Sequence, residues 1–371
     1  MSKNCVSFYF YQLGNSGGGA ERMIVNLANA LSKRGFSVLL ITWDAPDAHS
    51  FYPINQAVKW IRLGFKPSIA DKIRRVRALA EVLRTHEVKA LIGFVMSGDR
   101  TVYAAAKLAG VPLIAAERNG PAMYHLRYGA IHRWLTFRLL SLCSRIAVQF
   151  EDYAHGYPAY LRSRIVAIPN PVTPAEQLAQ PHVPNADGHL ILLAVGRLDP
   201  LQKRFEYLIK AFAHIAASFP QWRLRLIGDG PDEARLREMT AELGITQQVV
   251  FQASMSDVMQ AYTSAHLFVI PSLWEGFPNV LAEAMSHGLP AVGYAEADGV
   301  KHLIEHGKTG WLANGADEIS ALADVLKAAM SDHAERQHRG EKARLAMATY
   351  APELQYDRWA ALIRECMEEG V

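Results

Sequence analysis

Short apolar runs rich in β-branched residues alternate with longer helical patterns along the whole chain. This alternation is typical of parallel sheets whose strands are joined by crossover helices. The first half predicts strands at Val6–Tyr11, Ser37–Thr42, Ala90–Val95, Leu113–Ala116, Arg145–Gln149 and Ile165–Ile168. The second half predicts strands at Leu190–Val195, Arg223–Ile227, Val249–Gln252, Leu267–Ile270 and Pro290–Tyr294. The pattern therefore predicts an α/β protein with two halves of similar architecture.

A polar segment separates the two sets of strands, and it favours a linker because it contains Pro169, Pro171, Pro174, Pro181 and Pro184. We predict a first domain over residues 1–170, a linker over 171–187 and a second domain over 188–352. An amphipathic pattern follows and predicts a last helix over about 353–371. With 371 residues, half of them apolar, the chain can bury two cores.

The two halves carry opposite net charges. Residues 1–170 contain 22 Lys and Arg against 10 Asp and Glu, a balance of +12, and the remainder contains 17 against 26, a balance of −9. A basic first half favours an anionic partner such as a membrane surface or a lipid diphosphate. Nucleic acid is a weaker interpretation, because no recognised nucleic-acid motif accompanies the charge, and we predict no such partner.

Two segments of the first half combine basic and apolar residues. The pattern over Ile69–Arg84 predicts a helix that buries Ile69, Ile73, Val76, Ala80 and Leu83 and exposes Lys72, Arg74, Arg75 and Arg77. Tyr124–Arg145 is a second basic and aromatic segment. Two interpretations stay open: helices packed on a sheet with a solvated basic face, or contact with a membrane surface.

Other patterns limit the class of protein. No apolar run reaches the ~20 residues that a membrane helix needs. Cys5, Cys143 and Cys366 are widely separated and odd in number, which argues against a disulfide framework and a Cys-based zinc site. The fourteen histidines form no H-E-x-x-H pattern, and we predict no metal. A reducing cytoplasm is the expected compartment.

Two glycine-containing turns each follow a predicted strand. Gly17–Arg22 reads GGGAER and precedes a helical pattern, so its backbone can approach an anion at the helix N-terminus. Gly196–Arg204 reads GRLDPLQKR and delivers Arg197 and Lys203 at the carboxyl end of a strand, where they can clamp a diphosphate. Taken alone, the first could be a plain turn and the second a solvated basic loop.

The third motif, Pro271–Met285, again passes from a strand through a loop into a helix. Pro278 suits a first helical turn and leaves the N–H groups of Asn279 and Val280 free to meet an oxygen anion. Glu275 and Glu283 lie on either side of this turn. Carboxylates beside a phosphate-binding turn are good acceptors for sugar and ribose hydroxyls.

Read together, the strings GGGAER, VGRLDPLQKR, IGDGP and PSLWEGFPNVLAEAMSHGLP resemble the motifs of glycosyltransferase family 4. The resemblance covers nearly the whole chain. It implies a GT-B fold, with two Rossmann-like domains facing across a cleft and a last helix that crosses back to the first domain. It also implies a retaining glycosyltransferase without an obligatory metal or other cofactor, the nucleotide-sugar being a substrate.

The resemblance further implies roles for individual residues. Arg197 and Lys203 would hold the donor diphosphate, and Glu283 would accept from the ribose. Glu275 and the stretch Gly276, Phe277, Pro278, Asn279 and Val280 would bind the transferred sugar, and Gly18 and Gly19 would close over the donor. Residues from Ala253 to Met255 would contact the base. Arg197, Lys203 and Glu275 are the residues expected to matter most for catalysis.

One loop departs from the family's pattern. In many relatives a histidine follows the fourth strand of the first domain, whereas this chain reads Ala116-Glu117-Arg118-Asn119. We predict that Arg118 and Asn119 meet the sugar, the phosphate or the acceptor.

The resulting hypothesis is transfer of a hexose or N-acetylhexosamine from a UDP-sugar to a lipid-diphosphate-linked glycan in bacterial polysaccharide or oligosaccharide assembly. The protein would be cytoplasmic and peripheral to the inner face of the membrane, which its basic first domain would contact. The alternatives are a nucleotide-sugar epimerase of the same fold and a non-catalytic sugar-binding protein.

Overall fold

The computed structural model describes residues 4–14, 17–65, 71–94, 99–255, 258–315 and 318–369. The chain forms two compact units. The first comprises the residues up to Pro171 together with those from Glu353 onward, and the second comprises Val172–Pro352. The predicted return of the last helix to the first domain is therefore confirmed.

The described residues of the first unit form a seven-stranded parallel sheet in the order β3-β2-β1-β4-β5-β6-β7. Its strands are β1 (Cys5–Tyr9), β2 (Ser37–Thr42), β3 (Val58–Arg62), β4 (Ala90–Phe94), β5 (Leu113–Ala116), β6 (Arg145–Val148) and β7 (Ile165–Ala167). Neighbouring strands pair in parallel, with Val6 opposite Val38 on one side and Ala90 on the other. Buried parallel strands need apolar residues on both faces, which explains their continuous apolar sequence.

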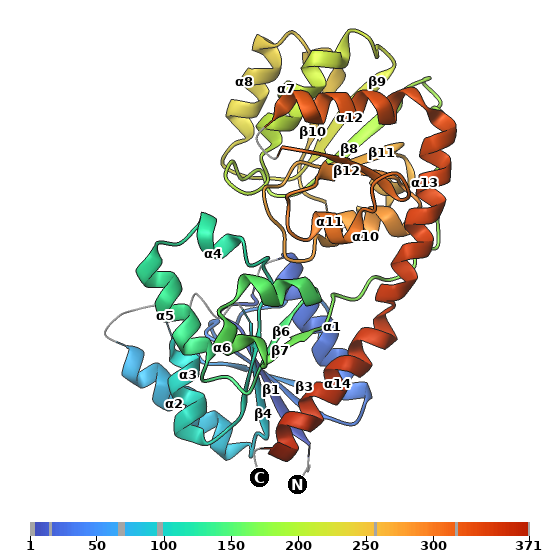
Figure 1. The fold of residues 1–371 in the computed structure, drawn as a ribbon. Helices are drawn as coiled ribbons and strands as arrows, with labels where there is room; N and C mark the ends of the chain where they lie inside the picture. The colour runs from blue at the N-terminus through green and yellow to red at the C-terminus, as the bar shows by residue number, and fades with distance from the viewer. Residues whose placement is uncertain are drawn as a thin grey trace. The chain divides into compact units, whose positions relative to one another are not determined.

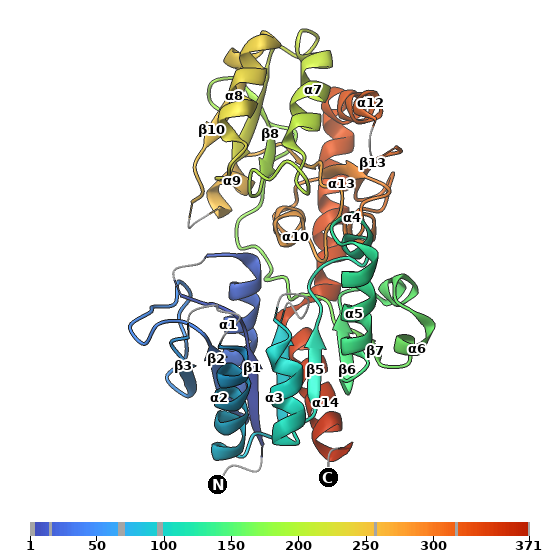
Figure 2. The ribbon, with the colours of Figure 1, turned by 90° about the vertical axis from the view of Figure 1, so that its left-hand side faces the viewer.

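Helices cover both faces of this sheet. They are α1 (Gly19–Lys33), α2 (Lys72–Thr85), α3 (Thr101–Ala109), α4 (Met123–Leu126), α5 (Ala130–Leu140), α6 (Ala159–Arg162) and α14 (Pro352–Glu369), with a 3₁₀ turn at Glu151–Gly156. Helices α1 and α14 lie on one face, and α2, α3 and α5 lie on the other (Figure 1 and Figure 2). The first unit is thus a three-layer α/β structure, as predicted.

The second unit contains a six-stranded parallel sheet within its described ranges, in the order β10-β9-β8-β11-β12-β13. The strands are β8 (Leu190–Val195), β9 (Trp222–Ile227), β10 (Val249–Gln252), β11 (Leu267–Ile270), β12 (Ala291–Tyr294) and β13 (Gly310–Ala313). The helices are α7 (Phe205–Ala216), α8 (Glu233–Glu242), α9 (Met259–Thr263), α10 (Asn279–Ser286), α11 (Val300–Leu303), α12 (Ile319–Ser331) and α13 (His333–Ala346), with 3₁₀ turns at Thr246–Gln248 and Met347–Tyr350. Helix α7 packs against α8 and α12, and α10 packs against α13.

Strands β3 and β13 are missing from the sequence-based expectations. Strand β3 reads VKWIR and alternates with charged residues, because it is an edge strand that is only partly buried. Strand β13 reads GWLA and is too short to give a pattern of its own. Both lie at sheet edges, where pairing with a neighbour rather than local sequence decides the structure.

The predicted helix over Ile69–Arg84 begins later, at Lys72, and Ile69 lies outside the described residues. The expected inward face is wrong at two positions. Ile73 is 68% exposed, whereas Arg75 is buried with Leu79, Ala80 and Leu83. Arg75 is drawn inward because its guanidinium forms an ion pair with Asp99, at 2.5 Å.

Helix α14 binds the first unit through its core and through ion pairs. Trp359, Ala360, Leu362, Ile363 and Cys366 are buried in the same cluster as β1, β2, β4 and α1. Arg34 of α1 forms ion pairs with Glu353 and Asp357. Acidic residues of the last helix thus meet the basic surface of the first unit.

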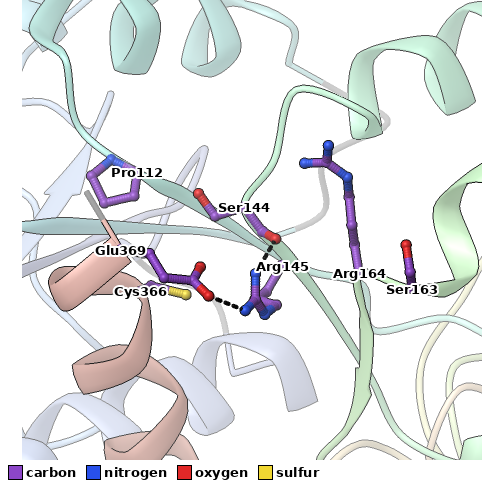
Figure 3. A pocket seen from close by; sticks show the side chains of 7 residues that line it. All are labelled: Pro112, Ser144, Arg145, Ser163, Arg164, Cys366 and Glu369. Carbon is purple, nitrogen blue, oxygen red and sulfur yellow. Dashed lines mark hydrogen bonds and ion pairs between the residues drawn. The ribbon is translucent and has the colours of Figure 1, made fainter. Parts of the chain in front are cut away.

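A second pair of ionic contacts holds the other end of α14. Arg145, the first residue of β6, pairs with Glu365 and Glu369 at 2.5 Å each. Figure 3 shows Arg145 beside a pocket of 420 Å³ that is lined by Pro112, Ser144, Arg145, Ser163, Arg164, Cys366 and Glu369. This pocket lies at the amino ends of β5, β6 and β7, the edge opposite the one where ligands of such sheets bind.

The segment predicted as a linker lies against the second unit. Two buried histidines hold it: His287 Nδ1 is 2.7 Å from the Gln177 carbonyl, and His266 Nε2 is 2.7 Å from the Val183 carbonyl. Arg336, also buried, donates from Nε to the Pro181 carbonyl at 2.9 Å. Within the described ranges, no helix combines the length and the hydropathy of a membrane span.

We expect Trp359→Ala to lower the free energy of unfolding by about 3–5 kcal/mol, since the indole is fully buried between α14 and the sheet. Urea denaturation with circular dichroism measures the change. Trp134→Ala is the matched control, because Trp134 is 61% exposed and its truncation should cost under about 0.5 kcal/mol. A loss from Trp359→Ala that is no larger than the loss from Trp134→Ala would contradict the expected contribution of the buried indole.

A pH dependence of stability is expected from His266. Burial lowers the pKa of His266, and its Nδ1 accepts a hydrogen bond from the Ile191 N–H at 2.9 Å, which requires the neutral ring. A group with a depressed pKa in the folded state stabilises the fold above its unfolded pKa of about 6.5 and loses this contribution as the pH falls through the folded pKa.

The wild-type protein should therefore lose more stability on acidification than His266→Asn, which has no titrating ring. Urea midpoints above and below about pH 6.5 measure the difference. The control is His214→Asn, at an exposed position of α7, and its pH profile should match that of the wild type. Identical profiles for all three proteins would contradict the assignment.

Candidate functional site

The sheet of the second unit reverses its strand order between β8 and β11. From β8 the chain builds outward through β9 and β10, and from β11 it builds outward through β12 and β13 on the other side. The loops after these two neighbouring strands, 196–204 and 271–278, therefore diverge at the carboxyl edge of the sheet. A ligand crevice in an open α/β sheet lies at such a switch point.

The loop after β8 is organised by Asp199. Its Oδ1 accepts from the backbone N–H groups of Leu201 and Gln202, each at 2.9 Å. Its carbonyl accepts from the Lys203 N–H at 3.1 Å. This local turn fixes the backbone that carries Lys203, a function that sequence reasoning did not assign to Asp199.

Lys203 and Glu275 join the two loops of the switch point. Lys203 Nζ lies 2.6 Å from Glu275 Oε1, and Ser272 Oγ donates to the same oxygen at 2.7 Å. The two side chains are only 18% and 9% exposed. A charged pair held this far from water is a stronger and more ordered interaction than a surface ion pair.

Arg197 differs from Lys203 in its surroundings. It is exposed, and its guanidinium makes no hydrogen bond or ion pair with any residue inside the described ranges. Arg204, directly after Lys203, is buried in a left-handed conformation with φ 53° and stacks over Tyr207. Such a conformation is strained for a residue with a side chain and concentrates at functional sites.

The loop after β11 enters α10 as predicted. Pro278 precedes the helix, and its carbonyl accepts from the N–H groups of Leu281 and Ala282 at 3.0 Å each. Gly276 and Phe277 are buried, and the Phe277 ring meets that of Tyr350 with centroids 5.3 Å apart. The partly exposed Asn279 and Val280 open the helix. The N-terminus of a helix carries a partial positive charge, so this end attracts an oxygen anion.

Glu283 lies one turn further along α10. Its Oε2 accepts from the Tyr262 hydroxyl at 3.0 Å. Tyr262 is buried in α9 and its ring also lies against His287, with centroids 5.3 Å apart. Tyr262 orients the carboxylate, and no sequence signal marked it, because it lies twenty-one residues upstream of Glu283.

Two glycines let the loops of this edge approach closely. A side chain at Gly228, after β9, would place its Cβ 1.9 Å from the Gly196 carbonyl oxygen. Gly299 has φ 82°, and a Cβ there would lie within 3.0 Å of the Glu275 and Gly276 carbonyl oxygens. The loop predicted to bind the diphosphate therefore packs directly against the backbone of Gly228. The loop predicted to bind the sugar packs in the same way against the backbone of Gly299.

Ala253 and Met255 follow β10 at the same edge. Ala253 is exposed and Met255 is partly exposed, and Ser254 between them donates its N–H to the Asp229 carboxylate at 3.2 Å. The structure brings the loops after β8, β9, β10 and β11 to one edge of one sheet. The donor-binding residues that the sequence predicts in the second unit therefore all lie along this edge.

The first unit has a switch point of its own, between β1 and β4. Gly18 is the N-cap of α1 and Gly19 is its first residue, so the glycine turn leads directly into a helix, as predicted. The Tyr52 hydroxyl donates to the Gly17 carbonyl at 2.7 Å. The two glycines lie in the first unit and the other donor residues lie in the second.

A buried polar cluster at this edge was missed by the sequence reasoning. The Asp99 carboxylate accepts from the Tyr9 hydroxyl, from Trp43 Nε1 at 3.1 Å and from Arg75 at 2.5 Å. Thr101 donates its N–H and its hydroxyl to the other oxygen. Burial would raise the pKa of Asp99, but these donors and the Arg75 charge hold it below its usual range.

Arg118 and Asn119 follow β5 at the carboxyl edge of the first sheet. Arg118 donates to the Asn170 side chain at 3.1 Å and to the Ala147 carbonyl at 2.9 Å, and it stacks over Trp359. Burial lowers the pKa of Arg118 to about 10, so it remains a cation at neutral pH. These contacts give Arg118 a role in holding α14, and its predicted ligand contact, like that of Asn119, stays a prediction.

Glu117, next to Arg118, is a further buried carboxylate. It accepts from the Tyr124 hydroxyl, and its carbonyl accepts from Gln149 Nε2 at 2.6 Å. Burial, followed by the Glu117 charge, raises the pKa of Tyr124 and of Tyr157. The loop that carries Arg118 is therefore fixed from both sides. No three His, Cys, Asp or Glu side chains gather as a metal site would require among the described residues.

Two protein families match adjoining parts of the chain. Residues 17–176 match the family described as Glycosyltransferase Family 4, and residues 177–346 match Glycosyl transferases group 1. The boundary between the two matches falls close to the division between the two compact units.

Curated relatives align over nearly the full length. An uncharacterized glycosyltransferase of Haemophilus influenzae is 27% identical, over 96% of this chain and 99% of its own length. A Campylobacter jejuni enzyme is 26% identical, over 97% of this chain and 98% of its own. Its name is GalNAc-alpha-(1->4)-GalNAc-alpha-(1->3)-diNAcBac-PP-undecaprenol alpha-1,4-N-acetyl-D-galactosaminyltransferase.

Solved structures share the fold. The lipopolysaccharide outer core galactosyltransferase WaaB has a TM-score of 0.76 at 20% identity, over 98% of this chain and 99% of its own. HepE of Anabaena, solved with UDP-glucose, has a TM-score of 0.79 at 17% identity, over 97% of this chain and 99% of its own. Because consecutive family matches cover both units and the fold is GT-B, the chain belongs to glycosyltransferase family 4.

Proposed function

We propose that the protein transfers a hexose or N-acetylhexosamine, with retention, from a UDP-sugar to a lipid-diphosphate-linked glycan. The observation that carries the proposal is the pair of Lys203 and Glu275, 2.6 Å apart and shielded from water at the switch point of the second unit. A fixed cation and a fixed carboxylate, placed together there, suit a diphosphate and the hydroxyls of the sugar attached to it.

The donor would bind along the carboxyl edge of the second sheet. Exposed Arg197 and the start of α10 add positive potential beside Lys203, where a diphosphate would lie. Glu283, oriented by Tyr262, would accept from the ribose hydroxyls. Ala253 and Met255, two strands away at the same edge, would leave room for the base. A UDP complex of HepE, which has the same fold, supports a uridine nucleotide.

The chemical step would need electrostatic stabilisation more than a protein nucleophile. As the bond between C1 and the diphosphate oxygen breaks, negative charge grows on the departing diphosphate. Cations that are already fixed in place lower the barrier, and loss of one such group typically costs about 10²- to 10³-fold in rate. The acceptor oxygen would attack C1 on the face that the diphosphate leaves, and its proton would pass to the leaving phosphate. The anomeric configuration is then retained, and no cofactor is required.

The acceptor would approach the first unit. Even with the acidic α14 included, residues 1–171 and 353–371 carry 24 Lys and Arg against 15 Asp and Glu, an excess of nine positive charges. A basic surface suits an acceptor with a lipid diphosphate, of the kind named for the Campylobacter jejuni relative. The protein would accordingly work in the cytoplasm, peripheral to the inner face of the membrane.

A saturating nucleotide should raise the melting temperature by roughly 5–10 °C, since ligand at 100 times its Kd adds about 2.7 kcal/mol to stability. We expect UDP and its sugars to do so, and GDP and ADP to have little effect. Lys203→Ala and Glu283→Ala should each weaken UDP binding about ten- to hundredfold. Differential scanning fluorimetry measures the shifts.

Lys210→Ala is the matched control for the binding test, because Lys210 also forms an ion pair but on α7, with Glu206. It should keep the full UDP shift. A protein that shows no nucleotide shift would contradict the donor site. Turnover of a UDP-sugar without any acceptor would favour an epimerase instead.

The ion pair should also couple in a double-mutant cycle. Lys203→Met leaves the Glu275 carboxylate shielded without its cation, which should cost about 1–3 kcal/mol of stability. Adding Glu275→Gln should recover part of that loss. The same cycle at Lys210 and Glu206, whose side chains are more exposed, should show under about 1 kcal/mol of coupling. Equal coupling at both pairs in urea denaturation would show that the switch-point pair is an ordinary surface contact.

A further inference from the structure

Helix α5 exposes a stripe of apolar and cationic side chains. Ile131 is 83% exposed and Trp134 is 61% exposed. Ile131, Trp134 and Arg138 follow one another at the three- and four-residue spacing that places them along one side of α5, and the exposed residues Arg127 and Leu142 lie just before and just after the helix. We call these five residues the α5 stripe. The opposite side of the helix buries Thr136, Phe137 and Leu140, so α5 is apolar on both sides.

The stripe lies on a firmly packed base. The Phe137 ring lies 5.0 Å from that of Tyr124 and 5.7 Å from that of Tyr157, measured between centroids. Tyr128 and His132 stack with centroids 4.3 Å apart. Ile131 and Trp134 are therefore held outward by a rigid aromatic layer rather than left outward by poor packing. An apolar surface presented in this way marks an interaction site.

The charge of the surrounding chain has one sign. No Asp or Glu occurs between Arg118 and Phe150, whereas Arg127, Arg133 and Arg138 all lie within or beside α5. In the part of the chain that the structure describes, none of these three forms an ion pair with a carboxylate. Arg138 instead lies over the Trp134 ring, 6.0 Å from its centroid. The partner of this surface must therefore be both apolar and anionic.

We propose that the α5 stripe docks the protein on an anionic phospholipid bilayer. Ile131 and Trp134 enter the interface between headgroups and acyl chains, where an indole is favoured. The guanidinium groups of Arg127, Arg133 and Arg138 remain at the level of the lipid phosphates, which their long stems allow. The inference rests on the proposed function in one respect: a lipid-linked acceptor requires the enzyme at the membrane.

Other occupants fit the stripe less well. A second copy of the chain, related by a twofold axis, would bring the same arginines against one another without a carboxylate between them. Nucleic acid would satisfy the arginines and leave Ile131 and Leu142 in water. Helix α2 also exposes an apolar residue, Ile73, but its Arg74 lies 3.7 Å from Asp71 and its Arg75 is bound to Asp99. Helix α2 also exposes Lys72 and Arg77, but Ile73 is the one large apolar residue that its described part exposes, whereas α5 presents both Ile131 and Trp134 beside its arginines.

The test is flotation of the full-length protein with vesicles of phosphatidylcholine alone and of phosphatidylcholine mixed with phosphatidylglycerol. We expect the wild type to float with the anionic vesicles only. Ile131→Ser combined with Trp134→Ser should lower the partition coefficient at least about tenfold, the loss expected from two apolar side chains that no longer leave water. Arg127→Gln, Arg133→Gln and Arg138→Gln together should lower it by a similar factor and remove most of its salt dependence.

Ile73→Ser is the matched control, because it removes an equally exposed apolar residue from a basic helix of the same unit. It should keep wild-type partition. Wild-type protein that does not float with anionic vesicles would overturn the proposal, as would a double variant that floats like the wild type. Loss through Ile73→Ser alone would assign docking to α2. Stripe-dependent self-association or binding to duplex DNA, without vesicle binding, would assign the stripe to those partners.

Transfer assays separate this inference from the proposed function. With an acceptor dissolved in detergent micelles, the double variant should match the wild type, because the donor residues are untouched. With the acceptor in anionic vesicles, its rate should fall about tenfold or more, in step with its binding. If the wild type transferred no sugar in either format, the proposed function would be contradicted. If the double variant transferred normally in detergent and bound vesicles like the wild type, the docking surface alone would be contradicted.

Discussion

The reversal of strand order in each sheet is the constraint on which the rest of the structure depends. Parallel strands need crossover helices, and where successive strands are added on opposite sides of one pair, the two following loops turn away from each other. In the second unit that pair is β8 and β11, and Lys203 and Glu275 close the gap between their loops. Residues seventy-two positions apart become neighbours because the sheet places their strands side by side.

Charge then acts on two scales. Within the site, Lys203 and Glu275 are shielded from water, which strengthens their attraction and fixes their positions before a ligand arrives. Across the first unit, the excess of basic residues meets the acidic last helix: Arg34 pairs with Glu353 and Asp357, and Arg145 pairs with Glu365 and Glu369. Burial of Trp359 and its neighbours supplies most of the stabilisation of α14 on the unit, and the ion pairs add contacts to α1 and β6 at its surface.

The carboxyl edge of the first sheet shows the same logic with buried polar groups. The Asp99 carboxylate accepts hydrogen bonds from donors at the ends of β1 and β2, in α2 and at the start of α3. A buried carboxylate is tolerated only where donors and a cation surround it. The ion pair with Asp99 lets Arg75 join the buried side of α2 with Leu79 and Leu83, and Ile73 then lies at the surface.

The sequence by itself determined the α/β class, the two halves, most of the strands and the three strand-to-helix turns, because these follow from local periodicity and from glycine and proline chemistry. The return of the last helix followed from the resemblance to the family. Only the tertiary structure decided the edge strands β3 and β13, the burial of Arg75 and the contacts that orient the site. Asp199 and Ser272 lie inside motifs in which sequence reasoning assigned them no role, and Tyr262 lies outside every motif, yet they position Lys203, Glu275 and Glu283. The contacts that are distant in sequence, Tyr262 with Glu283 and Lys203 with Glu275, form through strand order and packing, which are properties of the whole sheet rather than of any window of sequence.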